Sequence, residues 1–138
     1  MKTNFLILFI LGIVSALGIT SCDKLSNPEK PEPQVEIYLG YTVGDSGKIY
    51  KSINKGKTWT FQQSGTTEKL NSVFTLNENI AIAVGNNGLI LKTTNGGNNW
   101  YSQSSGTNVN LKKIRYNNSN GQIWITGEQG VLIVSNAN

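Results

Sequence analysis

Histidine is absent from the 138 residues of the chain, and cysteine occurs once. Without histidine, the chain lacks the commonest general base near neutral pH and the commonest protein ligand for metals. A single cysteine can form neither a disulfide within the chain nor a thiolate cage around a metal ion. We therefore expect no metal and no other cofactor, and we expect that the protein is not an enzyme.

Charge is scarce as well. Only 14% of the residues are charged, the formal net charge is +4, and Arg115 is the only arginine. Nucleic-acid-binding proteins concentrate basic residues in patches or stripes, and here Lys112, Lys113 and Arg115 form only a short cluster, which we expect to be a solvated strand face. We therefore expect no nucleic-acid partner.

Residues 1–21 have the features of a lipoprotein signal peptide. Lys2 precedes an apolar run over residues 5–19, which as a helix would span about 22 Å and fall short of the ~30 Å hydrocarbon core of a membrane. A charged start followed by a short apolar run is typical of secretory signals. The run ends in the sequence ITSC at residues 19–22, which resembles the lipobox of bacterial lipoproteins. The alternative is a general secretory signal with an incidental cysteine.

The lipobox resemblance implies that Cys22 is lipidated, through acyl chains such as palmitate, and becomes the new N-terminus. Residues 22–34 would then be the lipidated cysteine and a tether that contains all three prolines, Pro28, Pro31 and Pro33. Proline-rich segments are extended and semi-rigid. We therefore expect a protein of the cell envelope, lipid-anchored to a bacterial membrane, with its folded part outside the cytoplasm.

Residues 35–138 repeat. The octapeptide SINKGKTW at 52–59 returns 41 residues later as TTNGGNNW at 93–100. A third copy of the repeat unit begins at an offset of 42, where Gly127 and Gly130 follow Gly85 and Gly88. The units cover about 35–65, 66–106 and 107–138. In the second unit, β-branched and aromatic residues predict strands at about 70–76, 80–84, 89–94 and 99–104.

A period of 40–45 residues with four short strands predicts the blade of a β-propeller. The fold class is therefore all-β, with four-stranded antiparallel blades. The repeats amount to about two and a half blades, whereas closed propellers typically have 4–8, so the propeller in one chain is incomplete. Either several chains complete the ring, or the protein is a shortened descendant or a truncated product of a longer one.

The two octapeptides share the pattern Ser/Thr-x-Asn-x-Gly-x-x-Trp, which resembles the Asp-box, or BNR repeat, of sialidase-like and sortilin-like propellers. The resemblance implies a turn between the two outer strands of a blade. An oxygen acceptor, a glycine and a covering tryptophan would hold that turn together. Asparagine replaces the usual aspartate, which weakens the case for cation binding. The structural residues implied are Ser52, Asn54, Gly56, Trp59, Thr93, Asn95, Gly97 and Trp100.

The wider spacing resembles the photosystem II stability/assembly-factor-like propellers, over about residues 36–138. This resemblance implies a protein that binds other proteins. Family members use an arginine-rich surface for assembly, so the single Arg115 argues against a photosynthetic role. Tyr41, Ile82 and Trp124 share one repeat position, and we expect them in the core.

Catalysis has little support. Sialidases need an arginine triad, because guanidinium groups match the substrate carboxylate bidentately, and one arginine cannot supply it. The acids of the folded part are single residues without an evident facing pair, which a two-carboxylate glycosidase would need: Glu36, Asp45, Glu68, Glu78 and Glu128. A sugar-stacking platform at Trp59 and Trp100 remains an alternative.

The sequence thus predicts a non-catalytic, membrane-anchored binding or scaffolding lipoprotein. We expect a protein partner, or self-association that completes the propeller, with Val35–Tyr38 and Val131–Ser135 as open strands. The alternative is a degenerate or fragmentary sialidase-like protein that binds or processes glycans.

Overall fold

The computed structural model describes residues 38–136 of the chain. The signal peptide, Cys22 and the tether all lie outside these residues, and so does most of the 35–38 segment. Tyr38 is described, and it makes an isolated bridge with Asn54. Within residues 38–136, no helix combines the length and the apolar character that a membrane span requires.

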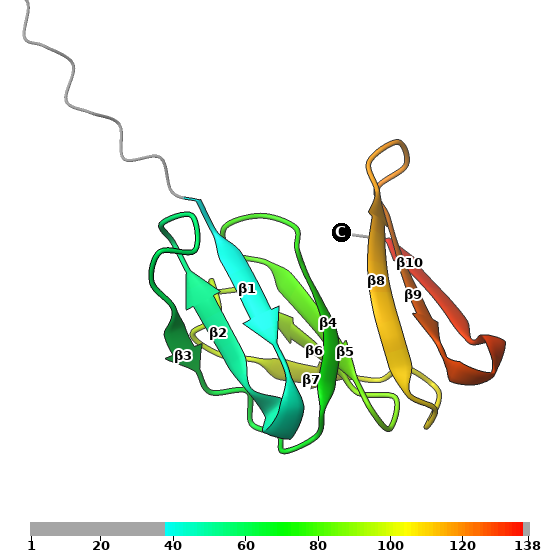
Figure 1. Cartoon of the computed structure of the whole chain (residues 1–138). Helices are drawn as coiled ribbons and strands as arrows, with labels where there is room; N and C mark the ends of the chain where they lie inside the picture. The colour runs from blue at the N-terminus through cyan, green and yellow to red at the C-terminus, as the bar shows by residue number, and fades with distance from the viewer. Residues whose placement is uncertain (1–37, 137–138) are drawn as a thin grey trace, which may run out of the picture. The chain divides into compact units, whose positions relative to one another are not determined.

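Ten strands form three antiparallel sheets, which lie side by side in Figure 1. The first sheet has the order β1-β2-β3, the middle sheet β4-β5-β6-β7 and the third β10-β9-β8. The strands are β1 (Gly40–Val43), β2 (Ile49–Ser52), β3 (Thr60–Gln62), β4 (Leu70–Thr75), β5 (Ala81–Gly85), β6 (Ile90–Thr93), β7 (Tyr101–Gln103), β8 (Leu111–Asn117), β9 (Gln122–Gly127) and β10 (Leu132–Asn136). Two single 3-10 turns, η1 (Asp45–Gly47) and η2 (Glu128–Gly130), join β1 to β2 and β9 to β10.

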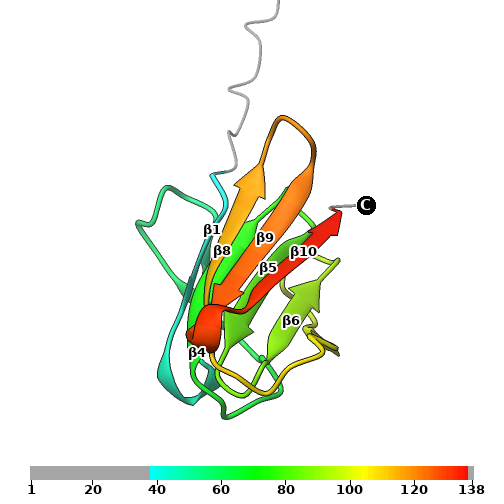
Figure 2. The ribbon, with the colours of Figure 1, turned by 90° about the vertical axis from the view of Figure 1, so that its right-hand side faces the viewer.

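The middle sheet confirms the four strands expected of a blade, with ends within two residues of those predicted. The other two sheets have three strands each among the described residues. By repeat position, the described residues of the first sheet contain no equivalent of the innermost strand β4, and those of the third sheet contain no equivalent of the outermost strand β7. Figure 2 shows the third sheet in front of the middle one, with β10 at its edge.

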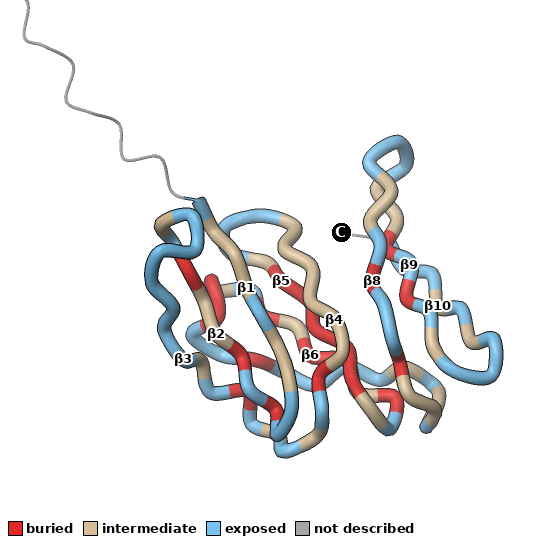
Figure 3. The backbone as a smooth tube through the Cα atoms, in the orientation of Figure 1, coloured by how far each residue is buried: buried red, intermediate tan, exposed pale blue. Residues whose placement is uncertain are grey.

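The core consists of two layers of side chains, one on each side of the middle sheet. Because this sheet is covered on both faces, β5 reads as an unbroken apolar run and every one of its residues is buried, as in other doubly covered strands. Figure 3 shows the buried positions along β5 and β6. The layer toward the first sheet contains Ile49, Leu70, Ala81, Ala83, Leu91 and Trp100. The layer toward the third sheet contains Ile82, Val84, Ile90, Leu111, Ile114, Ile123 and Ile125.

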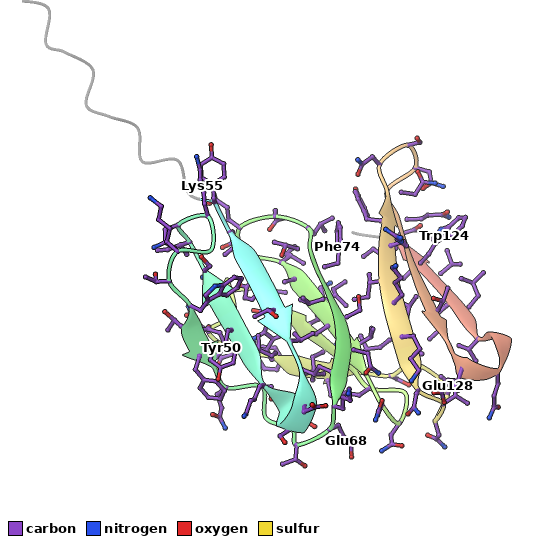
Figure 4. The ribbon with its side chains drawn as sticks, viewed as in Figure 1. Tyr50, Lys55, Glu68, Phe74, Trp124 and Glu128 are labelled. Carbon is purple, nitrogen blue, oxygen red and sulfur yellow. The ribbon has the colours of Figure 1, made fainter. Side chains whose placement is uncertain are left out.

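Each sheet therefore has two faces with distinct neighbours. We call the face toward the sheet that follows in the chain the following face, and the opposite one the preceding face. In β5, Ala83 belongs to the preceding face and Ile82 to the following face. On the following face, Phe74 stacks on Tyr116 of the third sheet, with ring centroids 5.5 Å apart, in the space between β4 and β8 (Figure 4).

Hydrogen bonds also tie the sheets together near their inner strands. The Asn71 side chain donates to the backbone oxygen of Leu111 over 2.8 Å and to the Asn86 side chain over 2.9 Å. The Gly88 amide donates to the backbone oxygen of Val109 over 2.9 Å. These bonds satisfy polar groups at the junction between the middle and third sheets.

Candidate functional site

The octapeptide turn of the first sheet is held by its own side chains. Ser52 Oγ accepts a hydrogen bond from the Gly56 amide over 2.9 Å, and Asn54 Oδ1 accepts one from the Thr58 amide over 2.9 Å. Ser52 Oγ also lies 3.1 Å from Asn54 Oδ1 and donates to it. Gly56 has a φ of 79°, a left-handed conformation that favours glycine.

The second octapeptide turn repeats this arrangement. Thr93 Oγ1 accepts from the Gly97 amide over 2.9 Å and donates to Asn95 Oδ1 over 3.0 Å. Asn95 Oδ1 accepts from the Asn99 amide over 3.0 Å, and Gly97 has a φ of 88°. The asparagine oxygen is thus engaged in holding the turn. Among residues 38–136, no group of three or more acidic, cysteine or histidine residues is placed to hold a metal ion.

The two tryptophans of these turns differ in exposure although they occupy the same repeat position. Trp100 is 8% exposed, whereas Trp59 is 45% exposed. Trp100 packs edge-on against Tyr41 of the first sheet, with centroids 5.6 Å apart and an interplanar angle of 87°. Trp59 lies over its own turn, where a Cβ atom at Gly56 would be 3.6 Å from its ring. The difference arises because Trp100 is covered by a preceding sheet.

Trp124 is not in the core, which corrects the sequence-based expectation. Tyr41 and Ile82, at the same repeat position, lie on following faces and pack against the next sheet. Trp124 also lies on a following face, but no further sheet of residues 38–136 covers it, and it remains 43% exposed. The repeat period shows that these three positions are equivalent, but it does not show which of them has a neighbouring sheet.

Trp124 belongs to a larger exposed surface on the third sheet. The strand register places Arg115, Trp124 and Val134 in one row across the sheet. Leu132 lies in the adjacent row and is 56% exposed, and Val134 is 49% exposed. We call this surface the third-sheet end face; its members are Lys113, Arg115, Trp124, Thr126, Leu132 and Val134.

The first sheet has a matching exposed surface on its preceding face. Tyr50 and Phe61 are partners in the register, and their rings make an edge contact with centroids 5.7 Å apart. Phe61 is 52% exposed. We call this surface the first-sheet end face; its members are Thr42, Tyr50, Trp59 and Phe61. Tyr50 and Trp124 lie on opposite sides of the three sheets in Figure 4.

A hollow deepens the first-sheet end face beside Tyr50. Its volume is about 330 Å³. The lining comes from β1, η1 and β2, and consists of Thr42, Val43, Gly44, Asp45, Lys48 and Tyr50. The equivalent part of the middle sheet is covered by the first sheet, so this hollow lies where an additional sheet would pack.

A second cavity, of about 350 Å³, opens between the middle and third sheets. It lies beside β10, the edge strand of the third sheet as far as residues 38–136 show. Isoleucines such as Ile82, Ile90 and Ile133 line one part of it, and polar side chains such as Lys92 and Gln103 line another. None of the described lining residues is an acid. The described lining therefore mixes apolar and polar surface and holds no pair of acids.

Two acids of the described residues form ion pairs at the surface. Asp45 pairs with Lys69 at 2.9 Å, and Glu128 pairs with Lys112 at 2.7 Å. The hydrogen bond from Lys69 holds the pKa of Asp45 below its usual value, and the one from Lys112 does the same for the pKa of Glu128. A general acid at neutral pH needs a raised pKa, so these two carboxyls are tuned in the opposite direction.

Tyr41 and Trp100 each carry a buried polar atom that makes no hydrogen bond with the described residues. The Tyr41 hydroxyl and the Trp100 indole N–H have no hydrogen-bond partner among the described residues. Burial raises the pKa of the Tyr41 phenol. Both side chains contribute to the layer between the first and middle sheets, so their aromatic packing outweighs the cost of these unpaired groups.

Comparisons with known proteins add evidence on the fold. No protein-family model matches the sequence, and no curated protein matches it. Among solved structures, YCF48 from Cyanidioschyzon merolae is similar, with a TM-score of 0.55 and 19% identity. That structure is a β-propeller. The three sheets of this chain are propeller blades. The alignment covers 74% of this chain and 34% of that one, so this chain spans about a third of the YCF48 length.

The sequence pattern indicated the octapeptide turns as the notable sites, but it did not indicate the two end faces. The repeat nevertheless contained a signal for the end faces. Trp124 and Leu132 are equivalent to Ile82 and Ile90, which are buried between sheets. Apolar residues thus continue at interblade positions on a face that no further described sheet covers.

Proposed function

We propose that this chain is a non-catalytic, membrane-anchored binding or scaffolding protein that contacts a protein partner. The observation that carries the proposal is the pair of end faces, where Trp124, Leu132 and Trp59 are exposed although their repeat equivalents are buried between neighbouring blades. Exposed apolar patches of this kind mark protein interaction sites. Eight residues of the two octapeptides have structural roles in the turns: Ser52, Asn54, Gly56, Trp59, Thr93, Asn95, Gly97 and Trp100.

The anchor rests on the sequence. Cys22 and the apolar run before it would place the folded blades at a membrane surface, with residues 23–34 as the spacer. The test is metabolic labelling with a fatty acid in a bacterial host, comparing the wild type with Cys22→Ala. We expect label and membrane association in the wild type alone. Label that persists in the variant would refute lipidation at Cys22.

The binding role is tested by photo-crosslinking in the same cells. A photoreactive amino acid at Trp124 or Phe61 probes the end faces, and one at Tyr101 is the control. Tyr101 is 56% exposed but lies on the outermost strand of the middle sheet, outside both end faces. We expect discrete crosslinked proteins from Trp124 and Phe61 and none from Tyr101. No crosslink at either end face would contradict the proposal.

The glycan-processing alternative predicts a different result. Purified protein would turn over a sialoside substrate, and loss of a catalytic acid would abolish this activity. Asp45 and Glu128 form surface ion pairs and have lowered pKa values, which supports binding over catalysis. Measurable sialoside turnover would replace the proposed function.

A further inference from the structure

The two end faces are complementary in a specific way. Within the chain, a following face packs on a preceding face twice: the first sheet on the middle sheet, and the middle sheet on the third. The third-sheet end face is a following face, and the first-sheet end face is a preceding face. The third-sheet end face is therefore of the type that packs on preceding faces inside this molecule, and the first-sheet end face is of the type that packs on following faces.

We propose that the third-sheet end face of one copy packs on the first-sheet end face of a second copy, head to tail. This inference rests on the proposed function and names its partner as a second copy of this chain. The contact would continue the blade-on-blade packing already present between the sheets of one chain. Two copies would bring together six sheets, within the range of 4–8 blades found in closed propellers.

The Tyr41–Trp100 contact supplies the pattern for the new interface. Tyr41 lies on a following face, Trp100 covers the preceding face of the next sheet, and the rings meet edge-on at 5.6 Å. Trp124 is the repeat equivalent of Tyr41, and Trp59 is the repeat equivalent of Trp100. In the head-to-tail pair, Trp124 of one copy therefore meets Trp59 of the other.

The exposures of the two rings agree with this pairing. Trp59 is 45% exposed, whereas its repeat equivalent Trp100, which has its neighbouring sheet, is 8% exposed. Trp124 is 43% exposed, whereas Ile82, at the same repeat position, is 8% exposed. Tryptophan and tyrosine are enriched among the residues that dominate protein interfaces. Leu132 and Val134 extend the apolar part of one face, and Phe61 extends that of the other.

The contact is heterologous, because different surfaces of the two copies meet. A heterologous contact closes into a ring only when the rotation per copy divides a full turn, and otherwise it continues as a filament. Blades of a propeller are related by rotation about a central axis, so repetition of the same interblade packing favours closure. The expected product is a closed dimer with two identical Trp124–Trp59 contacts.

Cysteine crosslinking distinguishes this arrangement from others. Cys22 is the only native cysteine, so the full chain with Cys22→Ser, purified in mild detergent, gives a thiol-free background. Trp59→Cys and Trp124→Cys are introduced separately and together. We expect a disulfide-linked dimer when the two single variants are mixed, and none from either one alone. The double variant should give a covalent dimer without larger products.

Solution mass measurements on the Cys22→Ser chain provide the second readout. We expect a dimer that dissociates on dilution, and a dissociation constant raised at least tenfold by Trp124→Ala or Trp59→Ala. Trp124→Phe, which keeps an aromatic ring, should restore most of the affinity, and Tyr101→Ala should leave it unchanged. Circular dichroism verifies that each variant remains folded.

Three results would overturn the inference. The first is a chain that stays monomeric at concentrations up to several hundred micromolar. The second is a disulfide-linked dimer formed by one single-cysteine variant on its own. The third is a ladder of covalent products larger than a dimer from the double variant. The proposed function fails separately. If the chain is monomeric but Trp124 crosslinks in cells to a different protein, the head-to-tail pair is refuted and the binding role stands.

Discussion

The contrast between Trp100 and Trp59 gives a quantitative test of the blade packing. Trp100→Ala removes a side chain that is 8% exposed and packs on Tyr41 and the middle sheet. Buried Trp→Ala substitutions cost about 3–5 kcal/mol. Trp59 is 45% exposed, so Trp59→Ala removes roughly half as much buried surface as Trp100→Ala does. We therefore expect Trp59→Ala to lower the free energy of unfolding by about 1.5–2.5 kcal/mol.

The assay is equilibrium urea denaturation followed by circular dichroism, at protein concentrations at which the chain is monomeric. Tyr41→Phe is the matched control, because it keeps the aromatic contact with Trp100 and removes a buried hydroxyl that has no partner among the described residues. We expect this variant to be neutral or slightly more stable than the wild type. Equal losses for Trp100→Ala and Trp59→Ala would show that the covering sheet does not determine the difference, and would refute the reasoning.

Two further predictions concern a turn glycine and a surface ion pair. Gly88→Ala places a Cβ against the backbone oxygen of Thr107 at a φ of 67°, whereas Gly130→Ala, at the equivalent position with a φ of 75°, meets nothing within 4 Å. In thermal melts we expect Gly130→Ala to lose about 1–2 kcal/mol of stability, and Gly88→Ala to lose about 1–3 kcal/mol more because of the clash. Equal losses of stability would rule out the clash. The pKa of Glu128 is lowered, chiefly by Lys112, so the pair stabilises the fold above the ordinary value of 4.5 and loses this effect as the pH falls through the lowered folded-state pKa. In urea titrations, Glu128→Gln should therefore weaken the acid sensitivity in that range, and more so at low salt than at high salt, because salt screens the exposed Lys112 pair. An unchanged pH profile at low salt would contradict the assignment.

Much of the fold could be predicted because one signal, the repeat, is carried by many residues. The four strands of the middle sheet follow from their β-branched and aromatic residues. The turns between them, such as Asn95 to Gly97, follow from local chemistry that determines the backbone. The first octapeptide predicted a turn of the same kind as the second one. The two turns are held by similar hydrogen bonds. Local sequence was sufficient at these positions because the partners lie within a few residues of one another.

The end faces could not be predicted, because burial depends on neighbours that the repeat does not specify. Tyr41, Ile82 and Trp124 occupy one repeat position, yet two pack against a following sheet and the third is exposed. Likewise, Trp59 and Trp100 have the same motif position but different coverage. Sequence equivalence predicts which way a side chain faces in a blade, while its burial depends on which blades are adjacent.

The central claim is that both end faces are covered by protein when the chain is in its membrane setting. Tryptophan-selective oxidative footprinting, read by mass spectrometry, tests this directly because the chain has only three tryptophans, Trp59, Trp100 and Trp124. We predict that Trp59 and Trp124 are protected in cells and become oxidised in dilute purified protein, while Trp100 is protected in both. Equal oxidation of Trp124 in cells and in dilute solution would contradict the account.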